Sequence, residues 1–224
     1  MQGLEYSVDI AFCIDATGSM SSIINLVKEW ALGFHDDLNA ALKAKDKHVD
    51  TLRVRVIEFR DCYVDGDNAF RTSEFFHLPE QSEAFASFVK DINASGGGDP
   101  PESGLEALAI AINSDWTATG SKRRHVIVVW SDTSTHPLEM NAGSKPSNYP
   151  QDIPETFDQL TDLWDGQMGM STSAKRLILF TPDAESWTDI QNHWENVVHY
   201  PSKAGMGLSD VNKQTILDTI AQSV

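Results

Sequence analysis

The run His125–Trp130 (HVIVVW) constrains the fold more than any other segment, because it is short, β-branched and apolar almost throughout. A strand with one solvated face alternates apolar and polar residues, whereas a strand covered on both faces reads as a continuous apolar run. Val8–Ile14 (VDIAFCI) has the same character and ends at the turn-forming sequence DATGS. Both segments are therefore expected to be interior strands of a sheet that helices cover on both sides.

Helical patterns alternate with these apolar runs. From Ser21 to Leu38 the apolar residues recur at helical spacing, which predicts one long amphipathic helix. Further helices are expected at 83–92, 105–112, 156–164, 187–197 and 210–221, and further strands at 52–59, 70–78, 176–180 and 197–201. Such alternation is typical of an α/β, Rossmann-like fold with a mainly parallel sheet, and the hairpin of 52–59 with 70–78 adds one antiparallel strand.

Length and charge limit the functions open to the chain. The 224 residues, 41% of them apolar, suit one α/β domain spanning 1–224. With 17 basic and 33 acidic residues the formal charge is −16, which disfavours nucleic acid and anionic membrane surfaces as partners. The first residues lack a signal-peptide pattern and no apolar run could span a membrane, so a cytoplasmic location is expected.

Oxygen-bearing side chains gather where chemistry is expected in such a fold. Ligands of open α/β sheets bind beyond the carboxyl ends of the strands, where the strand order reverses. Asp15, Thr17 and Ser19 directly follow the first strand, Asp99 follows a triple glycine, and Asp132 follows HVIVVW. This set contains no cysteine, and only His136 is near it, so a hard divalent cation suits it better than zinc or copper.

The sequence Asp15-Ala-Thr17-Gly-Ser19 resembles the DxSxS-type motif of von Willebrand factor A (vWA) domains, with Thr17 where serine is commoner. The glycine-rich loop and Asp132 fall in the order of that family's second and third metal loops. The segments IEFRDC, GGGDPPE and SDTSTHP are similar to those of the subgroup found with alpha-kinase-type and related intracellular proteins.

The resemblance implies a metal-ion-dependent adhesion site (MIDAS), at which Mg²⁺, or Mn²⁺ or Ca²⁺, leaves one coordination position for a partner's carboxylate. The implied ligands, direct or through water, are Asp15, Thr17, Ser19, Asp99 and Asp132. The implied function is metal-dependent protein–protein interaction with the partner docked at the metal face, and no residue is assigned a catalytic role. Oligomeric state is left open by the sequence.

Asp99 departs from the family pattern, since the second loop usually supplies a threonine hydroxyl. Three ionised aspartates around a dication would leave a net charge of −1, which weakens attraction for a partner's carboxylate. Either one aspartate binds through water, as magnesium commonly allows, or the partner is not a simple carboxylate.

Three other interpretations stay open. Asp15 and Asp99 would serve as helix caps in a degenerate scaffold that binds no metal. A metal-assisted phosphoryl or ester hydrolase would use the same ion to activate water, with His136 as the one candidate base. The triple glycine resembles a phosphate cradle, but no GK[ST] sequence follows it.

Overall fold

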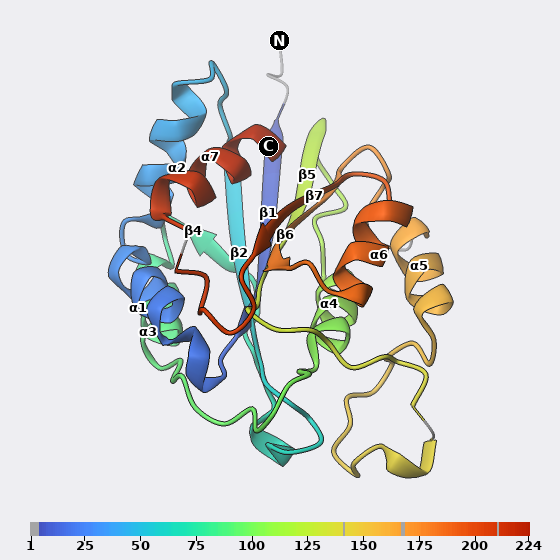
Figure 1. Cartoon of the computed structure of the whole chain (residues 1–224). Helices are drawn as coiled ribbons and strands as arrows, with labels where there is room; N and C mark the ends of the chain where they lie inside the picture. The colour runs from blue at the N-terminus through green and yellow to red at the C-terminus, as the bar shows by residue number, and fades with distance from the viewer. Residues whose placement is uncertain (1–4, 141, 167–168, 210) are drawn as a thin grey trace.

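The computed structural model describes residues 5–140, 142–166, 169–209 and 211–224. Within these ranges seven strands form a single sheet (Figure 1), in the order β3-β2-β1-β5-β6-β7, with β4 also paired to β2. The strands are β1 (Tyr6–Asp15), β2 (Thr51–Phe59), β3 (Phe70–Thr72), β4 (Phe76–Leu78), β5 (Lys122–Trp130), β6 (Lys175–Pro182) and β7 (Val197–Ser202). All pairs are parallel except those of β3 and β4 with β2. The mainly parallel sheet is therefore confirmed.

The antiparallel run expected at 70–78 is divided into two strands. β3 pairs with Ile57–Phe59, and β4 pairs with Leu52–Val54. Ser73, which lies between them, donates its backbone N–H to the carbonyl of Val56 and accepts the Val56 N–H at its hydroxyl, both at 2.9 Å. A side-chain oxygen thus replaces a backbone carbonyl at this point, and the ladder is interrupted without an unpaired amide.

Helices cover both faces of the sheet, as the continuous apolar strands require. They are α1 (Ser21–Trp30), α2 (Phe34–Lys43), α3 (Ser82–Lys90), α4 (Gly104–Ile112), α5 (Phe157–Asp165), α6 (Glu185–His193) and α7 (Lys213–Ser223), with short 3₁₀ turns η1 (Gly18–Met20), η2 (Gly66–Asn68) and η3 (Ala142–Ser144). In Figure 1, α1, α2, α3 and α7 lie on one side of the sheet and α4, α5 and α6 on the other.

The core is split by the sheet into two apolar clusters. Alternate residues of β1 face opposite sides, so Ile10 and Phe12 join the cluster under α1, α2 and α7, while Ala11 and Cys13 join the one under α4, α5 and α6. The ring of Phe12 stacks on Trp130 of β5 with centroids 5.0 Å apart. β1 is buried along its whole length, which confirms its interior position.

The expectation of one long helix from Ser21 to Leu38 was wrong. The helical pattern is interrupted between Trp30 and Phe34, and α2 begins after Gly33. Glycine has a low helix propensity, and the irregular turn lets both Phe34 and Leu38 remain buried. The last helix also starts later than expected, at Lys213, because the Asn212 side chain caps it by accepting the Thr215 N–H at 2.9 Å; Asp210 lies outside the described residues.

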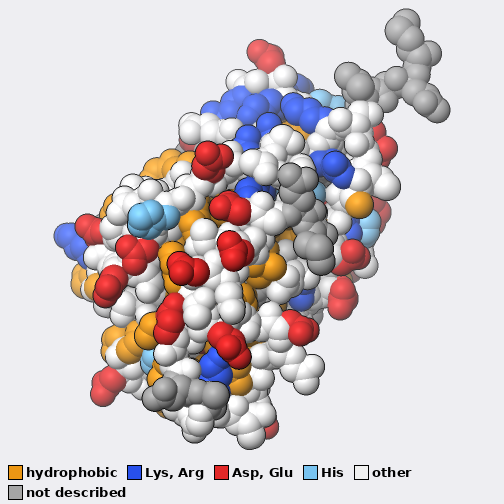
Figure 2. Space-filling model, turned by 90° about the vertical axis from the view of Figure 1, so that its right-hand side faces the viewer, with side chains coloured by type: hydrophobic (Ala, Val, Ile, Leu, Met, Phe, Trp, Pro, Cys, Tyr) orange, Lys and Arg blue, Asp and Glu red, His pale blue; other side chains and the backbone are white. Residues whose placement is uncertain are grey.

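The strand order places one crevice at the carboxyl ends of the parallel strands. From β1 the chain runs to β2 on one side and later to β5 on the other, so the order reverses between β1 and β5. The parallel strands run toward the lower part of Figure 1, where loops extend beyond their ends, on the side away from the two termini. Acidic side chains are spread widely over the surface that carries α5 and α6 (Figure 2), in keeping with the charge of −16. No helix in the described ranges is long and apolar enough to cross a membrane.

Candidate metal centre

Asp15 is the last residue of β1 and is fully buried at the crevice. Its Oδ1 accepts hydrogen bonds from the Thr17 N–H at 3.0 Å and the Thr17 hydroxyl at 2.6 Å. Its Oδ2 accepts one from the Ser131 hydroxyl, at 2.7 Å, which ties the end of β1 to the end of β5. Burial raises the pKa of Asp15 to about 6, against the lowering effect of the Thr17 and Ser131 hydrogen bonds.

Asp132 follows β5 and is held from two directions. Its Oδ1 accepts from the Ser19 hydroxyl at 2.8 Å, and its Oδ2 accepts from the Gly207 N–H at 2.7 Å. Its backbone carbonyl accepts the Gly205 N–H, also at 2.7 Å. The sequence analysis did not anticipate this second support, although the alternating glycines of AGMG were a visible signal of a close backbone approach.

Gly207 is required where it lies. Its φ of +55° is unfavourable for other residues, and a Cβ there would be 2.2 Å from the Ser19 carbonyl oxygen. The contact sets the distance between the 203–207 loop and the loop after β1, so it also positions Asp132 between them.

A cleft of about 660 Å³ opens above these residues. Its lining includes three of the five residues expected at the site, Thr17, Ser19 and Asp132, while Asp15 lies beneath and bonds to Thr17. Apolar residues complete the walls: Pro100, Pro182, Ala184 and Ala204. The structure therefore brings together Asp15, Thr17, Ser19 and Asp132, and adds Ser131 to them.

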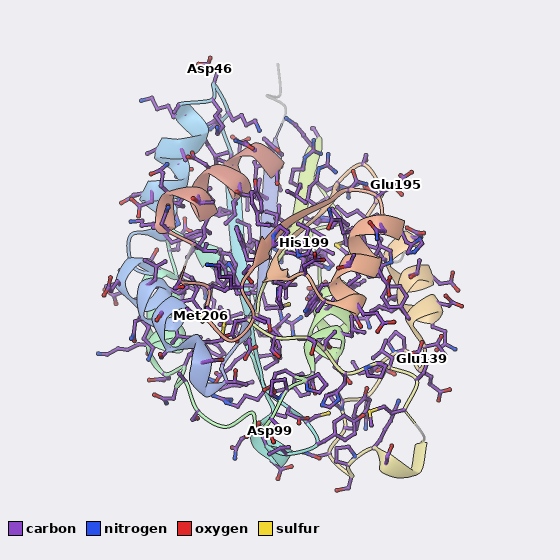
Figure 3. All side chains as sticks on the ribbon, viewed as in Figure 1. Asp46, Asp99, Glu139, Glu195, His199 and Met206 are labelled. Carbon is purple, nitrogen blue, oxygen red and sulfur yellow. The ribbon has the colours of Figure 1, made fainter. Side chains whose placement is uncertain are left out.

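Asp99 is not part of this arrangement. Its side chain is exposed and outside the cleft lining, and Figure 3 shows it at the lower edge of the molecule. Three preceding glycines with positive φ turn the loop, and Pro100 follows. Its role as a ligand, through water or otherwise, stays a prediction.

Glu102, three residues later, is the acidic residue of this loop that lies at the cleft. It lines the cleft and is only 4% exposed, because its backbone pairs with the segment after Asp132: its N–H donates to the Ser134 carbonyl at 3.1 Å, and its carbonyl accepts the His136 N–H at 2.8 Å. Sequence reasoning missed Glu102, since GGGDPPE was used only as a segment that resembles the family, and Asp99 was taken as the candidate ligand of that loop.

The Glu102 carboxyl group is incompletely satisfied. Its Oε2 is buried without a hydrogen-bond partner among the described residues. Burial, and then the negative charges of Asp15, Asp61, Asp65 and Asp132, raise its pKa to about 9. Gly97 makes room for it, since a Cβ at Gly97 would lie 2.6 Å from Glu102 Oε1.

A second network holds the glycine loop. Arg60, at the end of β2, pairs with Glu58 at 2.6 Å and donates to the carbonyls of Ser95, Asn68 and Asn93 at 2.8, 3.0 and 2.7 Å. Asp65 accepts the Gly97 N–H at 2.9 Å. The buried guanidinium therefore fixes the loop that carries Glu102.

His136 belongs to the support of the 133–151 loop and does not line the cleft. Its Nε2 lies 3.1 Å from Asp61 Oδ1, and its ring packs edge-on against Tyr63. Farther along the loop, Tyr149 donates a hydrogen bond of 2.8 Å to the fully buried Glu106. Burial raises the pKa of Glu106 to about 7.

The side chains at the cleft offer carboxylate and hydroxyl oxygens, which are the ligand atoms that hard divalent cations prefer. In the part of the chain that the structure describes, no three His, Cys, Asp or Glu side chains form a group that could hold a metal by themselves. Any ion would thus depend on hydroxyl oxygens from Thr17 or Ser19 in addition to carboxylates, as hard divalent cations accept. The unpartnered Glu102 oxygen at the same cleft fits this requirement.

The model of the von Willebrand factor A domain family matches residues 9–136, a range that contains all five expected ligands and Glu102. The chain belongs to this family. The match confirms the resemblance to vWA domains that the sequence motifs indicated.

Two known proteins resemble this vWA domain, one in sequence and the other in fold. The alpha-protein kinase vwkA of Dictyostelium discoideum is 30% identical over 159 residues, which cover 70% of this chain and 23% of that protein. The chain thus spans about a quarter of the length of that relative. The pilus adhesin SpaC of Lactobacillus rhamnosus GG covers 99% of the chain with a TM-score of 0.57 and 12% identity, and the chain covers 31% of SpaC. At this identity the likeness concerns the fold.

Proposed function

We propose that this vWA domain is a protein-interaction module that binds a divalent cation, Mg²⁺ or alternatively Mn²⁺ or Ca²⁺, in the cleft beyond β1 and β5. The observation that carries the proposal is the hydrogen-bonded convergence of Asp15, Thr17, Ser19 and Asp132 from two separate loops. Capping of α1 accounts for none of the contacts to Asp132, so a scaffold without metal explains less of the geometry.

Within this proposal, Glu102 contributes the third carboxylate, and Asp99 acts only through water. Glu102 is buried in the cleft wall, whereas the Asp99 side chain is exposed outside it. A bound dication would offer a coordination position to an oxygen atom of the partner. Hydrogen bonds from Ser131 and Gly207 would orient the carboxylates of Asp15 and Asp132, and the apolar walls of the cleft would limit the access of water.

The partner would contact apolar residues as well as the ion. Val64 and Met206 are 61% and 54% exposed, and both lie beside residues of the cleft wall. Val64 lies beside Gly98 of the cleft wall, and Met206 stands between Gly205 and Gly207, both of which bond to Asp132. These two residues would form apolar contacts at the edges of the metal face.

An enzymatic role is not part of the proposal. The hydrolase alternative needs a base at the ion, and His136 is engaged with Asp61 and Tyr63 away from the cleft lining. We expect no metal-dependent turnover of phosphate or carboxylate esters. Hydrolysis that disappears in His136→Ala would favour the hydrolase instead.

Calorimetric titration with Mg²⁺, Mn²⁺ and Ca²⁺ tests the proposal. Wild type should bind at least one ion, and Asp132→Asn should bind it more weakly. Asp183→Asn is a matched control, because Asp183 also lines the cleft, whereas its carboxylate accepts a hydrogen bond from Thr188, outside the set of candidate ligands. Absence of binding by the wild type, or equal loss in both variants, would leave the degenerate scaffold as the better interpretation.

A further inference from the structure

The end of the sheet opposite the cleft carries a concentration of positive charge. Figure 2 shows Lys and Arg side chains gathered at the top of the molecule, in contrast to the acidic surface below. We define the basic end as Lys45, Lys47, Lys122, Arg124 and Arg176. In a chain with only 17 basic residues and a charge of −16, such a cluster is not expected from composition.

Strand register places the basic end on one face. Lys122 and Arg124 are alternate residues of β5, so their side chains point to the same side. Arg176 of β6 pairs with Val126, two residues beyond Arg124, and therefore shares that side. Val126 belongs to the core cluster under α2 and α7, and Lys45 and Lys47 come directly after α2.

The five cations have no carboxylate partner within the ranges that the structure describes. Lys47 Nζ donates to the Ala221 carbonyl at 2.9 Å, Arg124 donates to the Ser173 carbonyl at 3.0 Å, and Lys122 lies 4.1 Å from the centroid of the Tyr6 ring. The Nε of Arg124 is buried with no hydrogen-bond acceptor.

Three acidic residues lie near the basic end: Asp50, Asp46 and the exposed Glu5, whose backbone carbonyl accepts the Lys122 N–H at 3.0 Å. Asp50 accepts the Tyr6 N–H at 2.8 Å and lies 3.4 Å from His48. Asp46, between Lys45 and Lys47 in the sequence, is exposed at the extreme tip of the molecule (Figure 3). Burial, and then repulsion from Lys122, Arg124 and Lys45, lower the pKa of Lys47, so these charges act on one another.

We propose that the basic end binds an acidic segment of a protein partner, whose carboxylates pair with guanidinium and ammonium groups that have no carboxylate partner among the described residues. A short peptide segment fits better than a long polymer of phosphates or a membrane, because either of these would extend beyond the patch and meet acidic surface. At physiological salt the screening length is about 8 Å, so a short acidic segment responds to the local cations more than to the distant acids. The two ends of the sheet would then hold two separate contacts.

The test is fluorescence anisotropy of a labelled glutamate octapeptide with the full chain, at low and physiological salt, with and without EDTA. Wild type should bind the peptide in a salt-dependent and EDTA-insensitive way, and a glutamine octapeptide should not bind. Lys45→Glu with Lys122→Glu should weaken binding by about tenfold or more. Lys28→Glu with Lys90→Glu, on α1 and α3, changes the net charge equally and should weaken it by less than about twofold.

Other results would overturn the proposal. Equal weakening by the two double variants would show that only net charge matters. Tighter binding to phosphatidylserine vesicles or duplex DNA than to the peptide would assign the basic end to a different class of partner. Self-association of the wild type that is lost in Lys45→Glu with Lys122→Glu would assign it to a second copy. Because EDTA should not affect this contact, its failure is separable from failure of the metal site.

Discussion

Ser19 and Asp132 are 113 positions apart in the chain, yet the Ser19 hydroxyl donates a hydrogen bond of 2.8 Å to the Asp132 carboxylate. This contact joins the loop after β1 to the loop after β5 across the point where the strand order reverses. The Gly207 N–H holds the other carboxylate oxygen at 2.7 Å. The candidate site is therefore assembled from three loops that are far apart in the sequence.

Asp132→Asn should lower the stability of the metal-free protein slightly and abolish most of the stabilisation by metal. The amide has one acceptor oxygen in place of two, so the Ser19 or the Gly207 hydrogen bond is lost at a cost of about 1 kcal/mol, partly offset by reduced repulsion with Asp15. A dication at a hundred times its Kd stabilises wild type by about 2.7 kcal/mol. Thermal melts with EDTA and with excess Mg²⁺ measure both effects. An equal metal-induced rise in the two proteins would remove Asp132 from the site.

Gly207→Ala should be more destabilising than Gly205→Ala. Both glycines have positive φ, so both variants incur a similar backbone cost. Only at Gly207 does a new Cβ meet backbone, 2.2 Å from the Ser19 carbonyl oxygen, which adds about 1–3 kcal/mol. Urea unfolding of both variants gives the difference, and similar midpoints would contradict the proposed close packing.

Glu102→Gln should weaken metal binding more than Asp99→Asn does. Both substitutions replace a carboxyl group with an amide, but of these two residues Glu102 is the one that lies in the cleft wall, with a buried oxygen that has no partner among the described residues. Calorimetric titration with Mg²⁺ compares the two affinities. A larger effect of Asp99→Asn would restore Asp99 as the ligand of the second loop.

Arg60→Met should destabilise the fold by about 3–5 kcal/mol, since it leaves three loop carbonyls without their donor and removes one cation from the buried Glu58. It should also weaken metal binding, because Arg60 holds the glycine loop through the carbonyls of Asn93 and Ser95. Arg71→Met is the control: Arg71 pairs with the same Glu58 at 2.7 Å but is more exposed and contacts Phe88. Unchanged metal affinity in Arg60→Met would separate the loop from the site.

The metal-free protein should lose stability as pH rises from about 4.5 to 7, in part through Glu106. Burial raises the pKa of Glu106 from 4.5 to about 7, so the native state binds its proton more tightly than the unfolded chain does. The resulting stabilisation, at most about 3 kcal/mol, is complete below pH 4.5 and lost above 7.

Glu106→Gln should remove this component, so its stability relative to wild type should increase from acid to neutral pH. Tyr149→Phe removes the hydrogen bond that favours the ionised carboxylate, and it should destabilise the protein more at pH 8 than at pH 5. Urea titrations in EDTA across this range measure the differences. Parallel curves for wild type and Glu106→Gln would contradict the assignment to Glu106.

Much of the architecture could be predicted because it depends on local pattern. The apolar runs VDIAFCI and HVIVVW identify strands buried on both faces, and only a sheet between two helical layers satisfies them. The residues that directly follow these strands, Asp15 and Asp132, must then lie at one edge of the sheet, since β1 and β5 are parallel. Their proximity was therefore predictable without knowledge of any loop conformation.

Sequence alone thus determined the fold class, the edge that carries the site and the oxygen chemistry of the first and third loops. Tertiary structure decided which acidic residue of the second loop lies at the cleft. Backbone pairing of Glu102 with Ser134 and His136 puts Glu102 in the cleft wall and leaves Asp99 outside. It also decided that Gly205 and Gly207 bind Asp132, and that helix formation stops before Gly33. The physical reason is that strand and helix periodicities repeat locally, whereas loop positions depend on single contacts between residues far apart in the chain.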